Sequence, residues 1–442
     1  MILKRVREGK LFGFLVCDIS LNPLHARKYD KYPVLIKRVQ VTADMLSQNQ
    51  QEMAKKLDKL PEGGSVECLA GVDSAKGYLL TGEHLAFLLS LPEGHVDVQE
   101  VHLVAEYTPR APLKETIEEL VRIRRSGDSH PSQKLKASVA KLLANSLYGR
   151  FFMDKRKWTK THIVPARDLA DLVRRPEFRS AVPLLTAEET VKRLREGYSL
   201  TVQDERDPDQ LYVVEMAYER ITLDSPLHVG CYILSKSKLR NMRAVQFLGD
   251  FLLPWLWSTS YCDTDSFCLL LGKKWLSSCV DPQKLEQYLR VERWKWFVPE
   301  ACEKCRSHWI AARFDKPNLR YEEVDWCQPS CCYEEELKMT RQPGLLKLEM
   351  ASTKMIALNP KSYIMQGPSG TKYGCKGVPA SLADDFEYST YAQLEEPLSV
   401  TMGGIRCRGT ALFSYRLTKS GLTPFDKKRV DTGHGTTRNL PG

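Results

Sequence analysis

The chain has 442 residues, of which 43% are hydrophobic and 27% charged, and its formal net charge at pH 7 is +10. This size and composition exclude a disordered tail and a small disulfide-stapled module, and they favour roughly two to four subdomains around a large core. The positive charge is localised, because residues 131–160 hold eight Lys or Arg against Asp154 alone, and residues 401–442 hold eight against two acids. Localised charge suits a protein that binds a polyanion, although a single charged run is more often a solvated face.

Cysteine usage and the N-terminal segment indicate the compartment. Thirteen cysteines, several of them in apolar segments, are typical of reduced thiols that pack as small hydrophobic side chains. Residues 1–20 have the charge pattern of a signal peptide, but the apolar run 11–17 ends in Asp18 without a cleavage site, which favours a buried strand. No apolar stretch approaches the length of a membrane span. The sequence predicts an intracellular protein without a signal peptide or transmembrane segment.

The first quarter of the chain alternates extended and helical segments. Apolar and alternating patterns predict strands, and polar runs with one apolar face predict helices. The expected elements are extended chain over 13–19 and 32–41, a polar helical excursion over 43–60, a helix over 83–91, a strand over 96–105 and a helix that begins at Pro112 and ends at Ser126.

A second helix is expected to begin with Ser129 and Pro131 as its cap and first turn. Its apolar side comprises Leu135, Val139, Leu142 and Leu143. Lys134, Lys141 and Tyr148 recur at seven-residue spacing on a different face, with Asn145 one turn beyond Lys141. Such a basic and aromatic face could grip phosphates and stack on a base or sugar, although a plain amphipathic helix explains the leucine pattern equally well.

The middle of the chain leads to a pair of aspartates. Short helices are expected over 164–197, a hairpin of 198–202 with 211–221, and a helix over 230–239. Asp263 and Asp265 then lie between the apolar runs 251–257 and 267–271, a pattern that predicts strand, tight turn and strand. Two carboxylates at the end of a hairpin are hard oxygen ligands that suit Mg²⁺. The alternative is an Asx-type turn whose aspartates accept backbone hydrogen bonds.

Two stretches, in this order, resemble motifs of the family B DNA polymerases. Residues 141–149, Lys-Leu-Leu-Ala-Asn-Ser-Leu-Tyr-Gly, resemble the fingers motif, and residues 261–266, Tyr-Cys-Asp-Thr-Asp-Ser, resemble the palm motif. Four later segments resemble the protein-primed branch found in organellar plasmids, linear DNA viruses and self-synthesising transposons. These segments are 343–349, 360–364, 375–379 and 419–429. The resemblance covers about residues 13–429 and implies an α+β, right-hand polymerase fold with an antiparallel palm sheet and helical fingers and thumb.

The resemblance also implies a division of the chain. The expected parts are a partial palm with an insertion over 1–110, fingers helices over 111–160, palm with the metal-site hairpin over 161–275, a Cys-containing insertion over 276–340, and the thumb and primer-grip region over 341–442. The proofreading exonuclease domain that precedes the palm in this family is expected to be absent.

By the same resemblance, the chain is a DNA-directed DNA polymerase module that adds deoxynucleotides to a primer by two-metal nucleotidyl transfer. Asp265 is implied as the main Mg²⁺ ligand and Asp263 as its support, and both count as catalytic. Lys141 is implied to pair with the triphosphate of the incoming dNTP, while Asn145 and Tyr148 shape its pocket.

DNA contacts are implied for Tyr261 near the primer end, for Lys361 and Tyr363 of the Lys-x-Tyr element that holds the primer strand, and for Lys134. The basic C-terminus is expected to grip the duplex backbone. The implied partners are primer–template DNA, dNTPs and, where priming uses a protein, a terminal priming protein. No membrane partner is expected.

This chain departs from the family at one essential position. The upstream pattern Asp-x-x-Ser-Leu-Tyr-Pro has no clean match, since Asp18 is followed by a motif one spacer short, with Asn22 in place of tyrosine. Cys17-Asp-Ile with Tyr32-Pro33 better resembles a later strand of the branch, and we assign Asp18 to that strand. The chain is then the carboxyl-terminal half of a polymerase without half of its metal site, and we expect little or no activity from it alone. The alternatives are a non-catalytic nucleic-acid-binding remnant and a structural protein that only shares the fold.

A possible zinc site is suggested by four thiols, Cys302, Cys305, Cys327 and Cys331. The first pair has a spacing common among zinc ligands, while the second is less typical. Free thiols in a loop-rich insertion are the favoured interpretation, and zinc is not expected.

Overall fold

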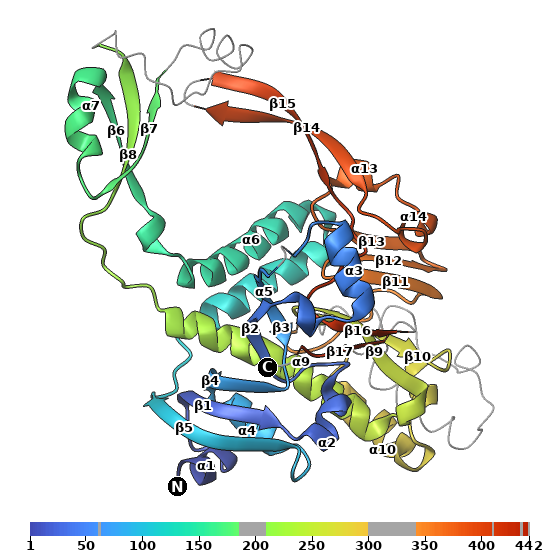
Figure 1. Ribbon diagram of the computed structural model, residues 1–442. Coiled ribbons are helices and arrows are strands. Elements are labelled where there is room, and N and C mark those ends of the chain that lie inside the picture. The colour runs from blue at the N-terminus through green and yellow to red at the C-terminus, as the bar shows by residue number, and fades with distance from the viewer. Residues whose placement is uncertain (61–62, 185–208, 299–341, 409–410, 434–435, 441–442) are drawn as a thin grey trace.

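The computed structural model describes residues 1–60, 63–184, 209–298, 342–408, 411–433 and 436–440 (Figure 1). In the N-terminal part, β1 (Gly13–Leu21) is the central strand of an antiparallel sheet, with β4 (Ser74–Thr81) on one side and β5 (Val96–Glu106) on the other. Side chains of β1 alternate between buried and half-buried, as a strand with one face on the core requires. Leu15, Cys17, Ile19 and Leu21 are its buried hydrophobic side chains.

Two helices cover the buried face of this sheet. Leu85 and Leu88 of α4 (Gly82–Leu89) join the core beneath β1. Leu239 and Met242 come from α9 (Leu227–Phe251), the longest described helix, and complete the same cluster. The short helices α1 (Ile2–Arg7) and α2 (Pro23–Ala26) flank the sheet. Because α9 continues beyond the sheet, it connects this core with the rest of the molecule (Figure 1).

The end of the chain returns to the N-terminal part. β2 (Ile36–Val41) pairs with β3 (Val66–Gly71), and α3 (Gln48–Lys56) lies between them in sequence. The C-terminal strands β16 (Val430–Gly433) and β17 (Thr436–Arg438) pair with each other nearby. Phe425, Val430 and Leu440 are buried in one cluster with residues of β2, α3 and β3. Contacts therefore cross the expected division between residues 1–110 and 341–442.

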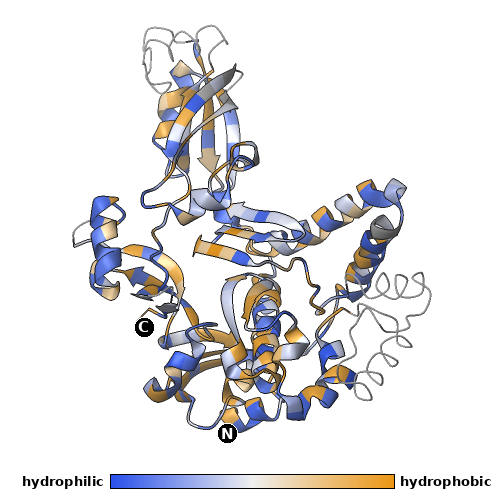
Figure 2. Ribbon diagram, turned by 90° about the vertical axis from the view of Figure 1, so that its right-hand side faces the viewer, coloured by the Kyte–Doolittle hydropathy of each residue, from blue (hydrophilic) through white to orange (hydrophobic). Residues whose placement is uncertain are grey.

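Two antiparallel helices, α5 (Lys114–Ser129) and α6 (Lys134–Phe151), form a pair that projects from the body (Figure 2). They approach closely at Gly127, where an added Cβ would lie 2.2 Å from Cβ of Ala137. The four apolar residues expected to define the helix's apolar side are all exposed, namely Leu135 (77%), Val139 (47%), Leu142 (65%) and Leu143 (53%). The small residues of α6, rather than its leucine stripe, make the contact with α5.

Two β units rise on either side of α6 in Figure 1. One has the strand order β6-β8-β7 with a helix beside it, and the other is a long hairpin of two strands. Their elements are β6 (Thr159–Pro165), α7 (Ala166–Val173), β7 (Phe178–Pro183) and β8 (Leu211–Ala217), then β14 (Ser399–Arg408) and β15 (Ala411–Ser420). β6 and β7 flank β8, and the partner expected for it, 198–202, lies outside the described residues.

The remaining elements surround the aspartate turn. β9 (Trp257–Asp263) and β10 (Ser266–Leu271) form an antiparallel hairpin. The expected first strand over 251–257 is wrong, because α9 continues to Phe251 and a 3-10 turn, Pro254–Leu256, follows it. A continuous apolar run does not distinguish a buried helix end from a strand. The other elements are α10 (Leu285–Arg290), β11 (Lys354–Asn359), β12 (Ser362–Gly367), β13 (Gly370–Cys375), α13 (Ala380–Ala383) and α14 (Tyr388–Ala392).

Every strand pair in the described sheets is antiparallel. Among the described helices, none combines the length and apolar character needed to cross a membrane.

Candidate metal centre

The turn between β9 and β10 holds its two carboxylates in a constrained backbone. Asp263 pairs with Ser266 across the hairpin, which leaves Thr264 and Asp265 as the loop. Thr264 has a φ of +54°, a conformation that a β-branched residue rarely adopts and that costs free energy. A strained backbone conformation persists only where the surrounding structure enforces it, and such conformations cluster at functional sites. The turn is therefore a place to look for function.

Helix α9 holds this strained turn from below. Asn241, a residue only 4% exposed, donates a hydrogen bond from Nδ2 to the carbonyl oxygen of Thr264 at 2.9 Å. Farther back along β9, Thr259 Oγ1 donates to the carbonyl oxygen of Lys31 at 2.8 Å. Because a buried amide needs a hydrogen-bond partner, the bond from Asn241 to Thr264 fixes where the loop lies relative to α9.

A lysine from a distant segment neutralises Asp263. Lys361, in the turn between β11 and β12, places its Nζ 3.0 Å from Oδ1 and 2.8 Å from Oδ2 of Asp263. Thr264 Oγ1 also donates to Asp263 Oδ1, at 3.0 Å. Burial of Asp263 opposes ionisation, yet the hydrogen bonds from Lys361 and Thr264 outweigh it and lower the pKa of the carboxyl below its usual value. The hydrogen bond with Asp263 in turn raises the pKa of Lys361.

These bonds bear on the two interpretations of the turn. The recorded partners of the Asp263 carboxylate are an ammonium and a hydroxyl from side chains, not the backbone N–H groups of an Asx-type turn. Asp265 is exposed beside it. Lys361 thus places a positive charge against the Asp263 carboxylate, and the carboxylate oxygens of Asp263 and Asp265 are of the hard type that divalent ions such as Mg²⁺ take as ligands.

Two tyrosines join the same group. The backbone N–H of Lys361 donates to the hydroxyl of Tyr261 at 2.9 Å, and the rings of Tyr261 and Tyr363 lie 5.0 Å apart at 45°. Lys361 itself has a φ of +68°. Burial raises the pKa of Tyr261. Tyr261, Asp263, Lys361 and Tyr363, which the sequence assigns to one site from segments about 100 residues apart, therefore lie together.

The residues expected to bind the nucleotide lie on α6, apart from this group. Lys134, Lys141 and Asn145 are exposed, and Tyr148 is half-buried with its ring 5.3 Å from that of Phe152. Burial raises the pKa of Tyr148. Among the described contacts, none joins these residues to the carboxylate turn.

Helix α9 bridges the two groups. Gly230 of α9 lies under Phe151 and Phe152 at the end of α6, where an added Cβ would come within 2.8 Å of the Phe152 ring. Asn241 follows eleven residues later, about 16 Å farther along the helix axis. One helix therefore contacts both the C-terminal end of α6 and the carboxylate turn.

Basic and aromatic side chains gather just beyond α6, a feature that the sequence reasoning missed. The guanidinium of Arg150 lies 5.5 Å and Lys155 Nζ 5.6 Å from the centre of a Trp158 ring, and Lys160 Nζ lies 5.0 Å from that of Tyr218. Cation–π contacts of this kind hold positive charge over aromatic faces. The tryptophan and its spacing from the basic run were the signals available for finding this cluster.

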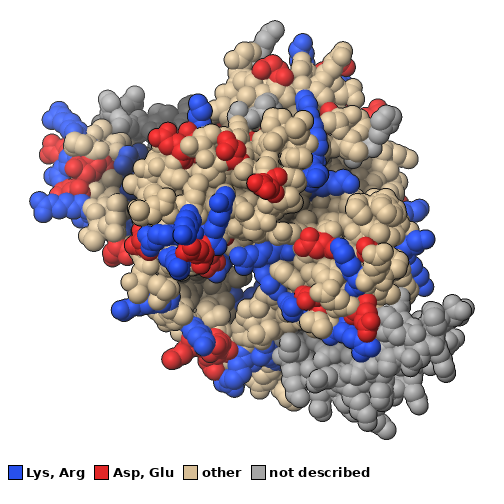
Figure 3. All heavy atoms as spheres, turned by 90° about the horizontal axis from the view of Figure 1, so that it is seen from below, with Lys and Arg blue, Asp and Glu red and all other residues tan. Residues whose placement is uncertain are grey.

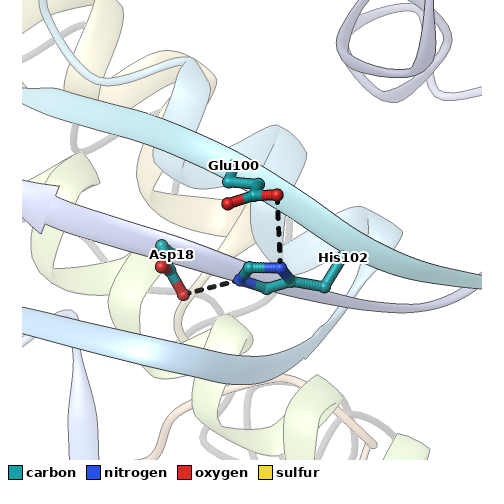
Figure 4. Close-up of side chains that lie close together, drawn as sticks. All are labelled: Asp18, Glu100 and His102. Atoms are coloured by element: carbon teal, nitrogen blue, oxygen red, sulfur yellow. Dashed lines mark hydrogen bonds and ion pairs between the residues drawn. The ribbon is translucent and has the colours of Figure 1, made fainter.

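Asp18 lies in a different environment. Because Cys17 and Ile19 face α9, Asp18 points to the opposite face of the sheet. There Oδ1 accepts from the N–H of Gly77 at 2.7 Å and lies 2.9 Å from His102 Nε2 (Figure 4). His102 Nδ1 is 3.7 Å from Oε1 of Glu100. This placement leaves Asp18 outside the carboxylate turn.

The Asp18, Glu100 and His102 side chains can each bring one ligand atom within 4.8 Å of the others. The two carboxylates nevertheless approach opposite nitrogens of one imidazole, whereas a metal would take only one of these nitrogens. The arrangement is that of a histidine paired on both sides. The bond with Asp18 raises the pKa of His102, and the Gly77 and His102 bonds lower that of Asp18.

The four thiols considered for zinc, Cys302, Cys305, Cys327 and Cys331, lie outside the described residues. The cysteines whose side chains the structure describes are free thiols, namely Cys17, Cys68, Cys231, Cys262, Cys268, Cys279 and Cys375.

Neither a scan of protein-family models nor searches of curated proteins and of solved structures found a match to this chain.

Proposed function

We propose that the chain is a DNA-directed DNA polymerase module, with impaired activity on its own, that binds primer–template DNA and holds Mg²⁺ at the Asp263–Asp265 turn. The observation that carries the proposal is that Tyr261, Asp263, Lys361 and Tyr363 lie in one group, in which Lys361 contacts both Asp263 and Tyr261 and the ring of Tyr363 lies beside that of Tyr261. These are the residue types that a primer end and a metal-bound triphosphate require, and they come from separate segments. The resemblance of the sequence to family B polymerases supports the same assignment.

The proposal gives a task to each of the candidate site residues. Asp265 and Asp263 would hold the metal, which when bound would supply the positive charge that stabilises attacking and leaving oxygens. Asn241 would position the loop through Thr264. Lys141, exposed on α6, would meet the triphosphate, and Tyr148 beside it would pack against the sugar. Lys361 and Tyr363 would hold the primer strand.

Low activity is expected because the described carboxylates at the turn are two, Asp263 and Asp265, and Asp18 is engaged elsewhere by Gly77 and His102. A metal ion held by the carboxylates of a single turn would be poorly positioned, and two-metal nucleotidyl transfer depends on the position of the metal ions. The small number of described carboxylates at the turn also favours the second candidate function, a nucleic-acid-binding remnant without catalytic activity.

The test measures binding of a primer–template duplex by fluorescence anisotropy over a range of salt concentrations. We expect affinity to fall steeply with salt, and Lys134→Met to weaken binding and reduce the salt slope by about 1. Lys56→Met is the matched control, because Lys56 is paired with Glu396 at 2.7 Å. Absence of binding at low salt would contradict both functions and leave a structural protein.

Primer extension with Mg²⁺ separates polymerase from remnant. We expect weak extension that Asp265→Asn abolishes while duplex binding persists. No extension by any preparation would favour the remnant, whereas vigorous extension would show that the metal site is complete and that Asp18 must be reconsidered.

A further inference from the structure

We infer that Lys361 is an internal substitute for the metal, so that the Lys361 ammonium and a divalent cation compete for Asp263. The inference rests on the proposed function and adds a regulation of that site. Lys361 Nζ lies within 3.0 Å of both carboxylate oxygens of Asp263, so it fills the side where a cation bound by both of these oxygens would lie. Both cannot occupy that side at once.

The backbone of Lys361 is held in place, whereas its side chain is free to change position. Its N–H is bonded to Tyr261 and its φ of +68° is held by the β11–β12 turn, so the main chain is anchored beside the site. Its side chain, in contrast, is 62% exposed, and an ion pair with so exposed a partner is weak. A cation of higher charge, bound also by Asp265, can therefore displace the ammonium without disturbing the turn.

Displacement links two binding events. The released ammonium remains tethered at the site, where it can meet a phosphate of the primer strand. Metal binding and Lys361 engagement are then coupled, and coupling of this kind is reciprocal. In the absence of metal, the same lysine keeps Asp263 neutralised, which explains why a carboxylate pair is tolerated at a strained loop.

The test uses the full chain without DNA or nucleotides and measures Mn²⁺ binding through the electron paramagnetic resonance signal of free Mn²⁺. We expect Lys361→Met to bind Mn²⁺ about fivefold more tightly than wild type, and Lys361→Arg to bind it more weakly, because a guanidinium grips a carboxylate with two parallel bonds. Lys372→Met is the matched control, because Lys372 of β13 pairs at 2.5 Å with Glu349, which lies in the chain before β11.

A long-range charge effect is excluded by the series itself, since Lys361→Arg keeps the charge and Lys372→Met removes one nearby. Asp263→Asn should abolish the difference between Lys361 and Lys361→Met in a double-mutant cycle. Equal Mn²⁺ affinity of wild type, Lys361→Met and Lys361→Arg would overturn the inference, as would absence of Mn²⁺ binding by all three. Neither result depends on DNA, so failure of the proposed polymerase function shows separately in the duplex-binding and extension assays.

Discussion

His102 is an exposed residue whose ionisation the surrounding carboxylates perturb. Its imidazole lies between Asp18 on β1 and Glu100 on β5, with the closer contact, 2.9 Å, to Asp18. The hydrogen bond that His102 donates to Asp18 raises the pKa of His102 above the ordinary value of about 6.5. A raised histidine pKa means that the folded state binds the proton more tightly than the unfolded state.

We predict that Asp18→Asn lowers the pKa of His102 toward its ordinary value, measured by NMR titration of the ring protons. The stabilisation from His102 is present below the ordinary histidine pKa and is lost as pH rises through the raised folded value. The stabilisation from Asp18, whose pKa is lowered, is present above the ordinary aspartate pKa and is lost as pH falls through the lowered folded value. The pair thus contributes most between about pH 4 and 6.5.

The control for that titration is Glu100→Gln, which should have a smaller effect because the Glu100 oxygen lies 3.7 Å from Nδ1. An unchanged His102 pKa in Asp18→Asn would show that the two side chains do not interact in solution.

At the scale of elements, the pair α5 and α6 shows that a strong apolar stripe need not mark the packed face. Leu135, Val139 and Leu142 are exposed, while Ala137 lies against Gly127 of α5 and Ala140 is buried. Small residues let the two helices approach closely, and the leucines on the far side are left uncovered by the described elements. Figure 2 shows hydrophobic residues along this projecting pair.

We predict that Gly127→Leu opens the contact between α5 and α6. Its Cβ would meet that of Ala137 at 2.2 Å, and overpacking of this kind costs about 1–3 kcal/mol. Hydrogen-exchange mass spectrometry should show faster exchange over residues 114–151 and little change elsewhere.

Gly149→Ala is the matched control on α6, because nothing lies within 4 Å of its added Cβ. It should leave exchange unchanged or slow it, since alanine favours a helix over glycine by roughly 0.5–1 kcal/mol. Equal exchange in Gly127→Leu and Gly149→Ala would contradict the close packing.

At the scale of the whole molecule, the end of the chain closes onto its beginning. Arg429 donates to the carbonyl oxygen of Asp30 and to Thr437, and the N–H of Asn439 donates to Asp30 Oδ1 at 2.9 Å. Gln50 Nε2 donates to the carbonyl oxygens of Asp426 and Arg429. Arg429, part of the basic terminus expected to grip a DNA backbone, is thus used inside the protein. The face seen from below likewise mixes basic and acidic side chains (Figure 3).

We predict that Phe425→Ala destabilises the unit made by β2, β3 and α3, although Phe425 lies more than 350 residues away in sequence. Phe425 is 7% exposed in that core, and loss of a buried phenylalanine costs about 3–5 kcal/mol. Hydrogen exchange over residues 36–71 should accelerate.

Leu417→Ala is the control for Phe425→Ala, because Leu417 is 41% exposed on β15 and should change little. Unchanged protection of residues 36–71 in Phe425→Ala would show that the C-terminal segment does not pack there.

The sequence by itself determined the local elements whose patterns are unambiguous. A continuous apolar run predicted β1, apolar periodicity predicted helices near α5 and α6, and two carboxylates between apolar runs predicted the β9–β10 turn. The expected helix end at Ser126 and cap at Ser129 are wrong, because α5 continues through Ser129 and α6 begins at Lys134 without a side-chain cap. The grouping of Tyr261, Asp263, Lys361 and Tyr363 in one site came instead from the resemblance to family B polymerases. Periodicity and turn chemistry act over a few residues, which is why these features can be read locally.

Only the tertiary structure decided which partners these features meet. It placed Lys361 on Asp263, Asn241 under Thr264 and His102 beside Asp18, and it turned the leucines of α6 outward. Periodicity shows which residues share a face but not what covers that face, and hydrogen-bond partners 84 or 98 residues apart leave no local pattern. The physical reason is that such contacts depend on how whole elements pack, which is a property of the folded chain.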